Sequence, residues 1–316
     1  MKILFQLDPI GTLNLEVDTS IALAKEAFKR GYELYCHTPS DLFLDGAEVK
    51  AKITHLIFQD ERIIQQDYGL KNLSDFDIIF IRQDPPFDIK YVTNCQMLAM
   101  VKGPLFINDP NSIITHSEKI YAHQFSEFMP KTLISDDISY LLEFLAENKQ
   151  AVIKPVNLSG GQGVELIQSN EASSRDKIST LLNLVKTPII IQQFLPEVVY
   201  GDTRVLICGN EIIGQVLRIP PSNKITANLC SGGVEASTQL SKIQKMVSKK
   251  IALDANQKGL IFIGLDFIGD YLTEINVTSP TGVVHASRQM DMNLSSNIWD
   301  VLLQKFLTKT PKKQAS

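Results

Sequence analysis

Three oxygen-bearing side chains lie close together near the C-terminal end of the chain, namely Asp266, Glu274 and Asn276. The apolar run from Leu260 to Ile268 and the run from Tyr271 to Val277 predict two strands joined by a turn. Glu274 and Asn276 are two residues apart, so they point to the same face of the second strand. Burying a carboxylate and an amide there costs free energy unless a cation compensates. Such hard oxygen ligands favour Mg²⁺, which completes its shell with nucleotide phosphates.

The register of this hairpin decides whether Asp266 belongs to the set. A strict two-residue turn, with Ile268 opposite Tyr271, would place Asp266 opposite Thr273 and away from Glu274. A three-residue loop or a β-bulge would place Asp266 opposite Glu274 on the same face. We predict this second register. The alternative interpretation is a polar edge hairpin with a solvated face.

A lysine and a glycine-rich turn follow one another upstream. Ala151 to Pro155 predicts a strand that places Lys154 near its end, and the next residues include Gly160 and Gly161. A strand, a glycine-rich turn and a returning strand form a flap whose backbone N–H groups can approach phosphates. A bare hairpin turn would use the same glycines. The segment is no Walker loop, because no Gly-Lys-Ser/Thr sequence opens a helix.

Two arginines stand on a predicted hairpin in the same half of the chain. Residues 201 to 218 alternate as two strands around Gly209-Asn210, so that Arg204 would face Gln215 and lie near Arg218. Two converging guanidinium groups suit a site that grips phosphate or carboxylate. Just before them, Pro188 to Pro196 predicts a buried strand whose end offers backbone groups to an adenine edge.

Arg82 and Asp84 are substrate-contact candidates in the N-terminal part of the chain. They follow the apolar strand predicted from Phe76, and ligands of open α/β sheets bind at the carboxyl ends of strands. The two prolines after Asp84 favour a rigid, extended wall. The alternative is that Arg82 forms a structural pair with a neighbouring acid.

The elements that must position these side chains follow from the hydrophobic pattern. A strand over Lys2–Leu7, a helix capped by Asp18 or Thr19 and a strand over Tyr32–His37 predict a doubly wound parallel sheet. Its first turn lacks G-x-G-x-x-G, so dinucleotide binding is not supported. The pattern also predicts a strand over 105–108 and helices over 90–101, 117–128, from Asp136 or Asp137 to 148, 238–258 and 294–307. The loop from Ile219 to Gly233 is long enough to be a lid or disordered.

Composition places the chain among ordinary globular proteins. Its 316 residues are 44% hydrophobic and 21% charged, with a net charge of −4, which argues against a nucleic-acid surface. No run is long enough for a membrane span, and the N-terminus lacks a signal peptide. Four cysteines are scattered without metal-type spacing, so a reducing cytoplasm is expected. The length predicts two or three compact subdomains.

Together these pieces resemble the ATP-grasp fold and, within it, the bacterial glutathione synthetase family. The resemblance runs nearly end to end. It is carried by Asp8-Pro9-Ile10, Lys29-Arg-Gly-Tyr-Glu-Leu34, Arg82-x-Asp-Pro-Pro-Phe-Asp88, Gly201-Asp-x-Arg-Val-Leu206, and above all by Gly259 to Asp270 continuing into Leu272 to Thr281.

The resemblance implies an α/β architecture. An N-terminal parallel-sheet domain over residues 1–116 would precede an ATP-grasp fold of two α+β subdomains with antiparallel sheets. These subdomains would span 117–196, with the glycine flap, and 197–308, followed by a flexible tail over 309–316. The resemblance also implies a homo-oligomer such as a tetramer.

Roles of individual residues are implied in the same way. Nucleotide contacts would come from Lys119, Lys154, Gly160, Gly161, Gln192, Leu195 and Asp202. Ligands for Mg²⁺ (or Mn²⁺) would be Asp266, Glu274 and Asn276. Catalytic contacts to the transferring phosphoryl group would come from Arg204 and Arg218. Substrate contacts would come from Arg82, Asp84 and Lys224.

The implied reaction is a two-step ligation. The γ-phosphate of ATP would pass to the cysteinyl carboxylate of γ-glutamylcysteine, and glycine would attack the acylphosphate to give glutathione, ADP and phosphate. The segment from Ile219 to Gly233 would act as a lid that keeps water away.

The chain departs from the family at three places. Thr226 and Val234 stand where the lid usually carries arginines, although Lys224 could partly substitute. The flap has Asn157-Leu-Ser159 in place of Asp-Gly-Met. Gly282 to Ser287 replaces an arginine and acidic residues. Two other interpretations therefore stay open: a related ligase with a different substrate pair, and a nucleotide-binding protein that does not ligate.

Overall fold

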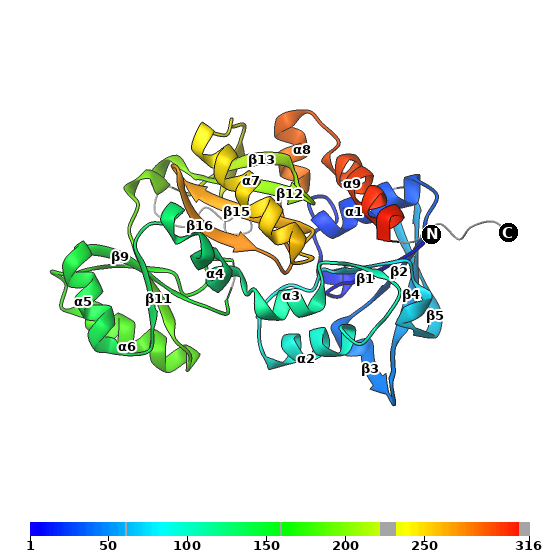
Figure 1. Ribbon diagram of the computed structural model, residues 1–316, viewed down its shortest axis with the longest axis horizontal. Coiled ribbons are helices and arrows are strands. Elements are labelled where there is room, and N and C mark those ends of the chain that lie inside the picture. Colours follow the sequence, from blue (N-terminus) through cyan, green and yellow to red (C-terminus); the bar gives the residue numbers. More distant parts are fainter. Residues whose placement is uncertain (61, 159, 222–231, 310–316) are drawn as a thin grey trace.

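The computed structural model describes residues 1–60, 62–158, 160–221 and 232–309 (Figure 1). In that part of the chain, three β-sheets of seven, four and five strands are covered by helices. The predicted class, a parallel-containing sheet followed by two antiparallel sheets, is confirmed. Within the same residues, no helix is long and apolar enough to cross a membrane.

The N-terminal sheet is parallel at its centre. Strand β1 (Lys2–Gln6) pairs in parallel with β2 (Glu33–His37) and with β6 (Ile78–Ile81), and β6 pairs in parallel with β7 (Leu105–Ile107). The side chain of Asp18 caps the helix that connects β1 to β2, as the sequence predicts. The helices of this region are α1 (Thr19–Lys29), α2 (Ile89–Leu98) and α3 (Pro110–Thr115).

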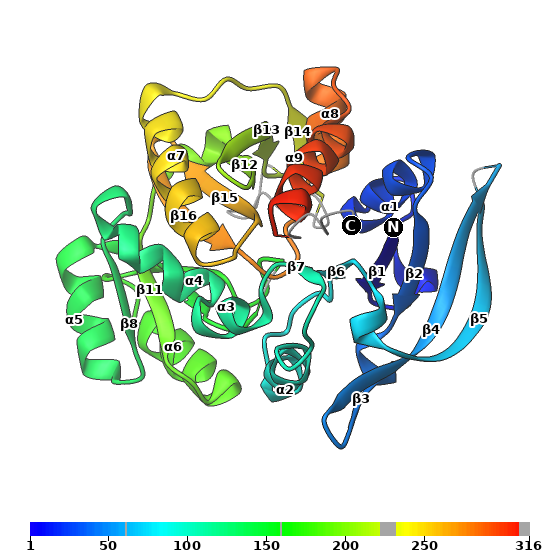
Figure 2. The ribbon, with the colours of Figure 1, turned by 45° about the vertical axis from the view of Figure 1, so that its right-hand side comes forward.

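Residues 42–72, to which the hydrophobic pattern assigned no element, complete this sheet. They form β3 (Leu42–Asp45), β4 (Glu48–Gln59) and β5 (Arg62–Asn72), which extend the sheet by antiparallel pairing in the order β3-β4-β2, with β5 on β4. Figure 2 shows the long β4–β5 arm standing away from the rest of the molecule. Most of β5 is exposed, so it carries little of the apolar alternation that identifies a strand.

The four-stranded sheet is antiparallel throughout, in the order β10-β9-β11-β8. Asp137 caps the helix after its first strand, as predicted. This sheet and its two helices lie at the left of Figure 1. The elements are β8 (Thr132–Ser135), α5 (Ile138–Asn148), β9 (Gln150–Pro155), β10 (Glu165–Gln168), α6 (Ser173–Val185) and β11 (Ile189–Gln193).

The helix predicted from residue 117 to 128 is broken. Only α4 (Glu118–Tyr121) is α-helical; a 3₁₀ segment over Ala122–Phe128 follows, and Phe125 has non-helical φ −121° and ψ 34°. Phe125 is buried in the core against the ring of Tyr121. Tertiary packing therefore overrides the local helical pattern.

The five-stranded sheet has the order β14-β13-β12-β15-β16. Its elements are β12 (Asp202–Cys208), β13 (Glu211–Ile219), β14 (Val234–Ala236), α7 (Lys242–Gln257), β15 (Phe262–Ile268), β16 (Tyr271–Asn276), α8 (Val283–Met290) and α9 (Leu294–Lys309). Further 3₁₀ turns lie at Ile10–Thr12, Pro39–Asp41, Leu73–Asp75 and Pro196–Tyr200.

The predicted register of the β12–β13 hairpin is wrong by one residue. Arg204 lies opposite Val216 and not opposite Gln215, because a bulge at Ile213 inserts one residue between the pairs Leu206–Gly214 and Ile207–Ile212. In the observed register both arginines still lie on one face of the sheet. Arg204 pairs with Val216, and Val216 and Arg218 are two residues apart on β13.

Buried contacts join the N-terminal and five-stranded sheets. The side chain of Asn108, just after β7, donates to the carbonyls of Phe262 and Val277 at 2.8 and 2.7 Å and accepts from Phe262 N at 2.7 Å. The Trp299 indole on α9 donates to the carbonyl of Leu23 on α1 at 2.8 Å. Two apolar clusters accordingly contain residues of both sheets, whereas a third is confined to the four-stranded sheet and its helices.

Candidate active site

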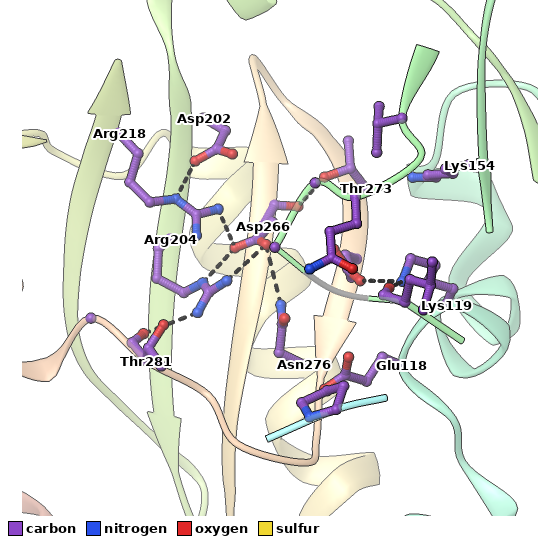
Figure 3. Close-up of a pocket in the computed structure, with 18 of the residues that line it drawn as sticks. Glu118, Lys119, Lys154, Asp202, Arg204, Arg218, Asp266, Thr273, Asn276 and Thr281 are labelled. Atoms are coloured by element: carbon purple, nitrogen blue, oxygen red, sulfur yellow. Dashed lines mark hydrogen bonds and ion pairs between the residues drawn. The ribbon is translucent and has the colours of Figure 1, made fainter. Parts of the chain in front are cut away.

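A cavity of about 530 Å³, the central cavity, lies between the four-stranded and five-stranded sheets (Figure 3). The loops after β1 and β6 and the start of α8 close it on a further side. Thirteen of the predicted site residues line it: Asp84, Lys119, Lys154, Gly160, Gly161, Gln192, Leu195, Asp202, Arg204, Arg218, Asp266, Glu274 and Asn276.

The β15–β16 hairpin has the predicted register. Asp266 lies opposite Glu274 and Gly264 lies opposite Asn276, because a bulge at Thr273 offsets the strands between these pairs and the turn. The Thr273 hydroxyl donates to the carbonyl of Asp266 at 3.1 Å. Asp266, Glu274 and Asn276 therefore share one face, and Figure 3 shows Asp266 and Asn276 side by side.

Two arginines hold the carboxylate of Asp266. Arg204 donates Nε to Oδ1 at 2.5 Å and Nη2 to Oδ2 at 3.0 Å, and Arg218 Nη2 lies 2.9 Å from Oδ1. Burial alone would raise the pKa of Asp266, but the two guanidinium charges outweigh it and hold that pKa well below its ordinary value. Asp266 is therefore ionised at neutral pH.

Arg218 is held in turn by Asp202, which lies opposite it in the β12–β13 pairing. Its Nε donates to Asp202 Oδ1 at 2.5 Å. Burial would lower the pKa of Arg218, but the charges of Asp266 and Asp202 raise it above its ordinary value. The pKa of Asp202 is raised by burial, and the charge of Arg218 opposes this shift. The two acids and two arginines form one buried ionic network.

Two lysines lie on the side of the central cavity nearest the four-stranded sheet. Lys119, on α4, lies 3.2 Å from Glu274 Oε1 and donates to the carbonyl of Leu158 in the flap at 2.6 Å. Lys154, on β9, donates to Gln192 Oε1 at 3.1 Å. Burial lowers the pKa of Lys154 to about 8, although the charge of Glu274 partly opposes the shift.

The donor chemistry of the hairpin suits a magnesium ion. No group of three or more His, Cys, Asp or Glu side chains in the described part of the chain could hold a metal. Asp266, Glu274 and Asn276 instead offer two carboxylates and an amide, a set that needs phosphate oxygens to complete a shell. The amide nitrogen of Asn276 donates to Asp266 Oδ2 at 3.2 Å, which leaves its oxygen for a cation.

Arg82 and Asp84 differ in their surroundings. Asp84 lines the central cavity, and burial raises its pKa. Arg82 is buried and does not line the central cavity. Its Nε donates to Ser20 Oγ at 2.9 Å, and its Nη1 has no hydrogen-bond partner among the described residues. Lys224 and Thr226, in the predicted lid, lie outside the described residues.

Sequence reasoning gave no site role to several residues that line the central cavity, among them Glu118 and His285. Oε1 of Glu118 accepts hydrogen bonds from the Thr278 hydroxyl at 2.6 Å and from the Val277 and Thr278 backbone N–H groups at 3.2 Å each. Burial, reinforced by the charge of Glu274, raises the pKa of Glu118. The only sequence signal for Glu118 is its position beside Lys119, and that for His285 is its position within Gly282–Ser287.

Comparisons with known proteins cover almost the whole chain. Residues 1–113 match the family model of the prokaryotic glutathione synthetase N-terminal domain, and residues 118–291 match the model of its ATP-grasp domain. The glutathione synthetase of Rhodopseudomonas palustris is 34% identical over 306 residues, covering 96% of this chain and 98% of the relative. That of Yersinia pestis is 35% identical over 289 residues, covering 90% and 91%.

Solved structures give a matching picture of the fold. D-cycloserine synthetase DcsG superposes with a TM-score of 0.69 at 14% identity, covering 96% of this chain and 99% of that one. The macrocyclase MdnC from Microcystis aeruginosa superposes with a TM-score of 0.64 at 14% identity, covering 96% and 100%. At such identities the likeness concerns the fold alone.

Proposed function

Because the chain belongs to the prokaryotic glutathione synthetase family, we propose that it joins γ-glutamylcysteine to glycine through an acylphosphate, giving glutathione, ADP and phosphate. The family establishes the broader activity: the protein is an ATP-dependent ligase with an ATP-grasp domain. The two substrates and the intermediate are the proposal.

The observation that carries the proposal is the placement of the arginine network beside the oxygen set of the β15–β16 hairpin. Arg204 and Arg218 are buried, fixed by Asp266 and Asp202, and line the same cavity as Glu274 and Asn276. Phosphoryl transfer needs fixed positive charge near the equatorial oxygens of the transferred group and little covalent chemistry from the protein. Arginines held in one orientation by acids supply that charge without reorganising.

We assign ATP to the side of the central cavity that the four-stranded sheet builds. Lys119 and Lys154 would meet the phosphates, and Gly160 and Gly161 would let the flap backbone approach them. The end of β11 at Gln192 and the nearby Leu195 would meet the adenine edge, with Asp202 near the nucleotide. Asp266, Glu274 and Asn276 would hold Mg²⁺ or Mn²⁺, which when bound neutralises phosphate charge.

The proposal extends to the rest of the molecule. Lys224 and the other lid residues, by analogy with the family, would keep water from the acylphosphate. Cys36, Cys95 and Cys208 are buried free thiols, as expected of a protein in the reducing cytoplasm. We also infer a homo-oligomer such as a tetramer, which light scattering of the purified protein tests directly.

Measuring ADP release with γ-glutamylcysteine and glycine, each omitted in turn, tests the proposed function. Turnover that requires both substrates supports it. Turnover that requires a different peptide or amine would indicate a related ligase with another substrate pair. ATP binding without turnover on any such pair would indicate a nucleotide-binding protein that does not ligate, and would refute the proposal.

A further inference from the structure

One end of the central cavity, here named the substrate end, carries charges that the nucleotide and metal assignments do not use. It is built by the loops after β1 and β6 and by the start of α8, away from the four-stranded sheet. Its residues that line the cavity include Asp18, Asp84, Ser279, Gly282 and His285.

His285 is held in place by an acid from a neighbouring strand. Its Nδ1 is hydrogen-bonded to Oε2 of Glu235 on β14, and only 18% and 22% of the two side chains are exposed. Glu235 lies opposite Arg218 in the β13–β14 pairing, so the pair adjoins the arginine network. A carboxylate on Nδ1 fixes the orientation of the ring and leaves Nε2 as the nitrogen that can meet a ligand in the cavity.

Two carboxylates share the substrate end with this imidazole. Oδ1 of Asp18 caps α1 by accepting from Ile21 N at 2.9 Å. Burial raises the pKa of Asp84, the charge of Arg82 opposes this shift, and the negative charge of Asp18 adds to it. The backbone N–H of Val283 donates to the hydroxyl of Thr19 at 3.4 Å, so the start of α8 touches the start of α1. The carboxylates and the imidazole are therefore held at one end of the cavity by adjoining elements.

This combination suits the head group of an amino acid, which carries an ammonium and a carboxylate on one carbon. The two aspartates suit the ammonium, and the imidazolium form of His285, which donates Nδ1–H to Glu235 and Nε2–H into the cavity, suits the carboxylate. Glycine is a poor candidate, because its amine must attack as the free base and two neighbouring carboxylates would keep it protonated. The glutamyl ammonium of the dipeptide takes no part in the reaction, so it can be held as a cation.

We propose that His285, oriented by Glu235, binds the α-carboxylate of the glutamyl end of the dipeptide, while Asp18 and Asp84 face its ammonium. His285 is then a specificity-determining residue and Glu235 a positioning residue. The inference rests on the proposed function, because it names a part of that substrate. It also gives a role to the Gly282–Ser287 segment, where the chain departs from its family.

Three dipeptide substrates separate the contribution of the α-carboxylate from that of the ammonium. γ-Glutamylcysteine carries both head-group charges, 4-aminobutyrylcysteine lacks the α-carboxylate, and glutarylcysteine lacks the ammonium. The variant His285→Ala should raise KM for γ-glutamylcysteine about 10- to 100-fold, since it loses one charge-assisted hydrogen bond. It should raise KM for glutarylcysteine equally, leave KM for 4-aminobutyrylcysteine unchanged, and leave KM for ATP and glycine within about twofold.

Matched variants distinguish a role of Glu235 in positioning His285 from a general loss of structure. Glu235→Gln should raise KM for γ-glutamylcysteine less than His285→Ala does, and it should add nothing in the His285→Ala background, because it acts through His285. Exposed Glu211→Gln on the same sheet is the control for loss of a carboxylate. His285→Gln, which keeps a polar donor of similar length, replaces His285→Ala if circular dichroism shows that the alanine variant does not fold.

Wild-type turnover with γ-glutamylcysteine and glycine tests the proposed function first, and its absence would overturn that function together with the inference. Where the wild type turns over, three results would overturn the inference alone. One is an unchanged KM in His285→Ala; another is a loss that falls on glycine or ATP; the third is an equal loss with 4-aminobutyrylcysteine.

Discussion

Asp266 is the residue on which the charges of the central cavity converge. Its carboxylate meets Arg204 and Arg218 and accepts from the amide of Asn276, and the side chain is buried. Replacing Asp266 would leave the guanidinium groups of Arg204 and Arg218 buried without that partner, which would destabilise the folded protein. The neighbouring Glu274 is less buried, with 23% of its side chain exposed. It is therefore the better residue with which to test chemistry apart from folding.

The variant Glu274→Gln should reduce ligase turnover by at least about 100-fold while its melting temperature stays close to that of the wild type. It removes the negative charge that would hold the metal and that faces Lys119, but keeps the shape of the side chain. Steady-state ADP release and thermal unfolding measure the two effects. Exposed Glu211→Gln on β13 is the matched control. Wild-type turnover in Glu274→Gln would refute the metal assignment.

Lys154 should make ATP binding depend on pH. Burial lowers its pKa to about 8 in the free protein, and phosphates next to its ammonium would raise that pKa on binding. Binding at about pH 9 should therefore take up a proton, and KM for ATP should increase above about pH 8. Calorimetry in two buffers of different ionisation enthalpy measures the uptake. Lys154→Arg, which stays charged, should show none; equal heats in both buffers for the wild type would contradict the assignment.

The lowered pKa of Lys154 also makes the stability of the folded protein depend on pH. Between pH 8 and the ordinary lysine value of 10.5, the unfolded chain binds a proton at Lys154 that the folded protein does not bind. The contribution of this residue to the free energy of unfolding therefore rises with pH across that window.

At the scale of elements, the β15–β16 hairpin was predictable because its side chains constrain its register. A one-residue slip would turn Asp266 away from Glu274, and the bulge at Thr273 prevents it. The β12–β13 hairpin lacked such a constraint. The bulge at Ile213 depends on how β13 packs against α8 and α9, which no local sequence pattern contains.

Two other features of the fold, β5 and the break at Phe125, could not be predicted, each for its own physical reason. The exposed β5 lacks apolar alternation, and the break at Phe125 follows from core packing. Most predicted site residues share the central cavity because they follow strand ends and turns whose positions the sequence indicates. His285 and Glu235 meet only through the packing of α8 on the sheet, across 50 residues of chain.

Gly201 lies immediately before β12, where the chain approaches the backbone of Arg218 on β13 closely. Its φ is +108°, and an added Cβ would lie 2.6 Å from the backbone oxygen of Arg218. Gly201→Ala should therefore destabilise the protein by about 2 to 4 kcal/mol and lower turnover by displacing Arg218. Chemical unfolding and ADP release measure both. Gly11→Ala, with open space around its Cβ, is the control; equal stability of the two variants would contradict this packing.

At the scale of the whole molecule, the apolar clusters predict how the protein unfolds. The cluster around Ile153 and Leu141 is confined to the four-stranded sheet, whereas Trp299 lies in a cluster shared by the other two sheets. Domain boundaries near 116 and 196 remain a prediction. If they are correct, fluorescence of Trp299, the sole tryptophan, should report one transition and far-ultraviolet circular dichroism should report two. Coincident curves would contradict an independent four-stranded unit.

The contact between α1 and α9, described above through Trp299 and Leu23, has a consequence for how the chain is made. The apolar surface of β1, at Ile3 and Phe5, belongs to the same cluster as Trp299. On a ribosome, this surface leaves the exit tunnel long before its partner is synthesised. At about 5 to 20 residues per second, the first strand waits roughly 15 to 60 s for the last helix. The part of this apolar surface that α9 covers therefore stays uncovered until α9 has been synthesised.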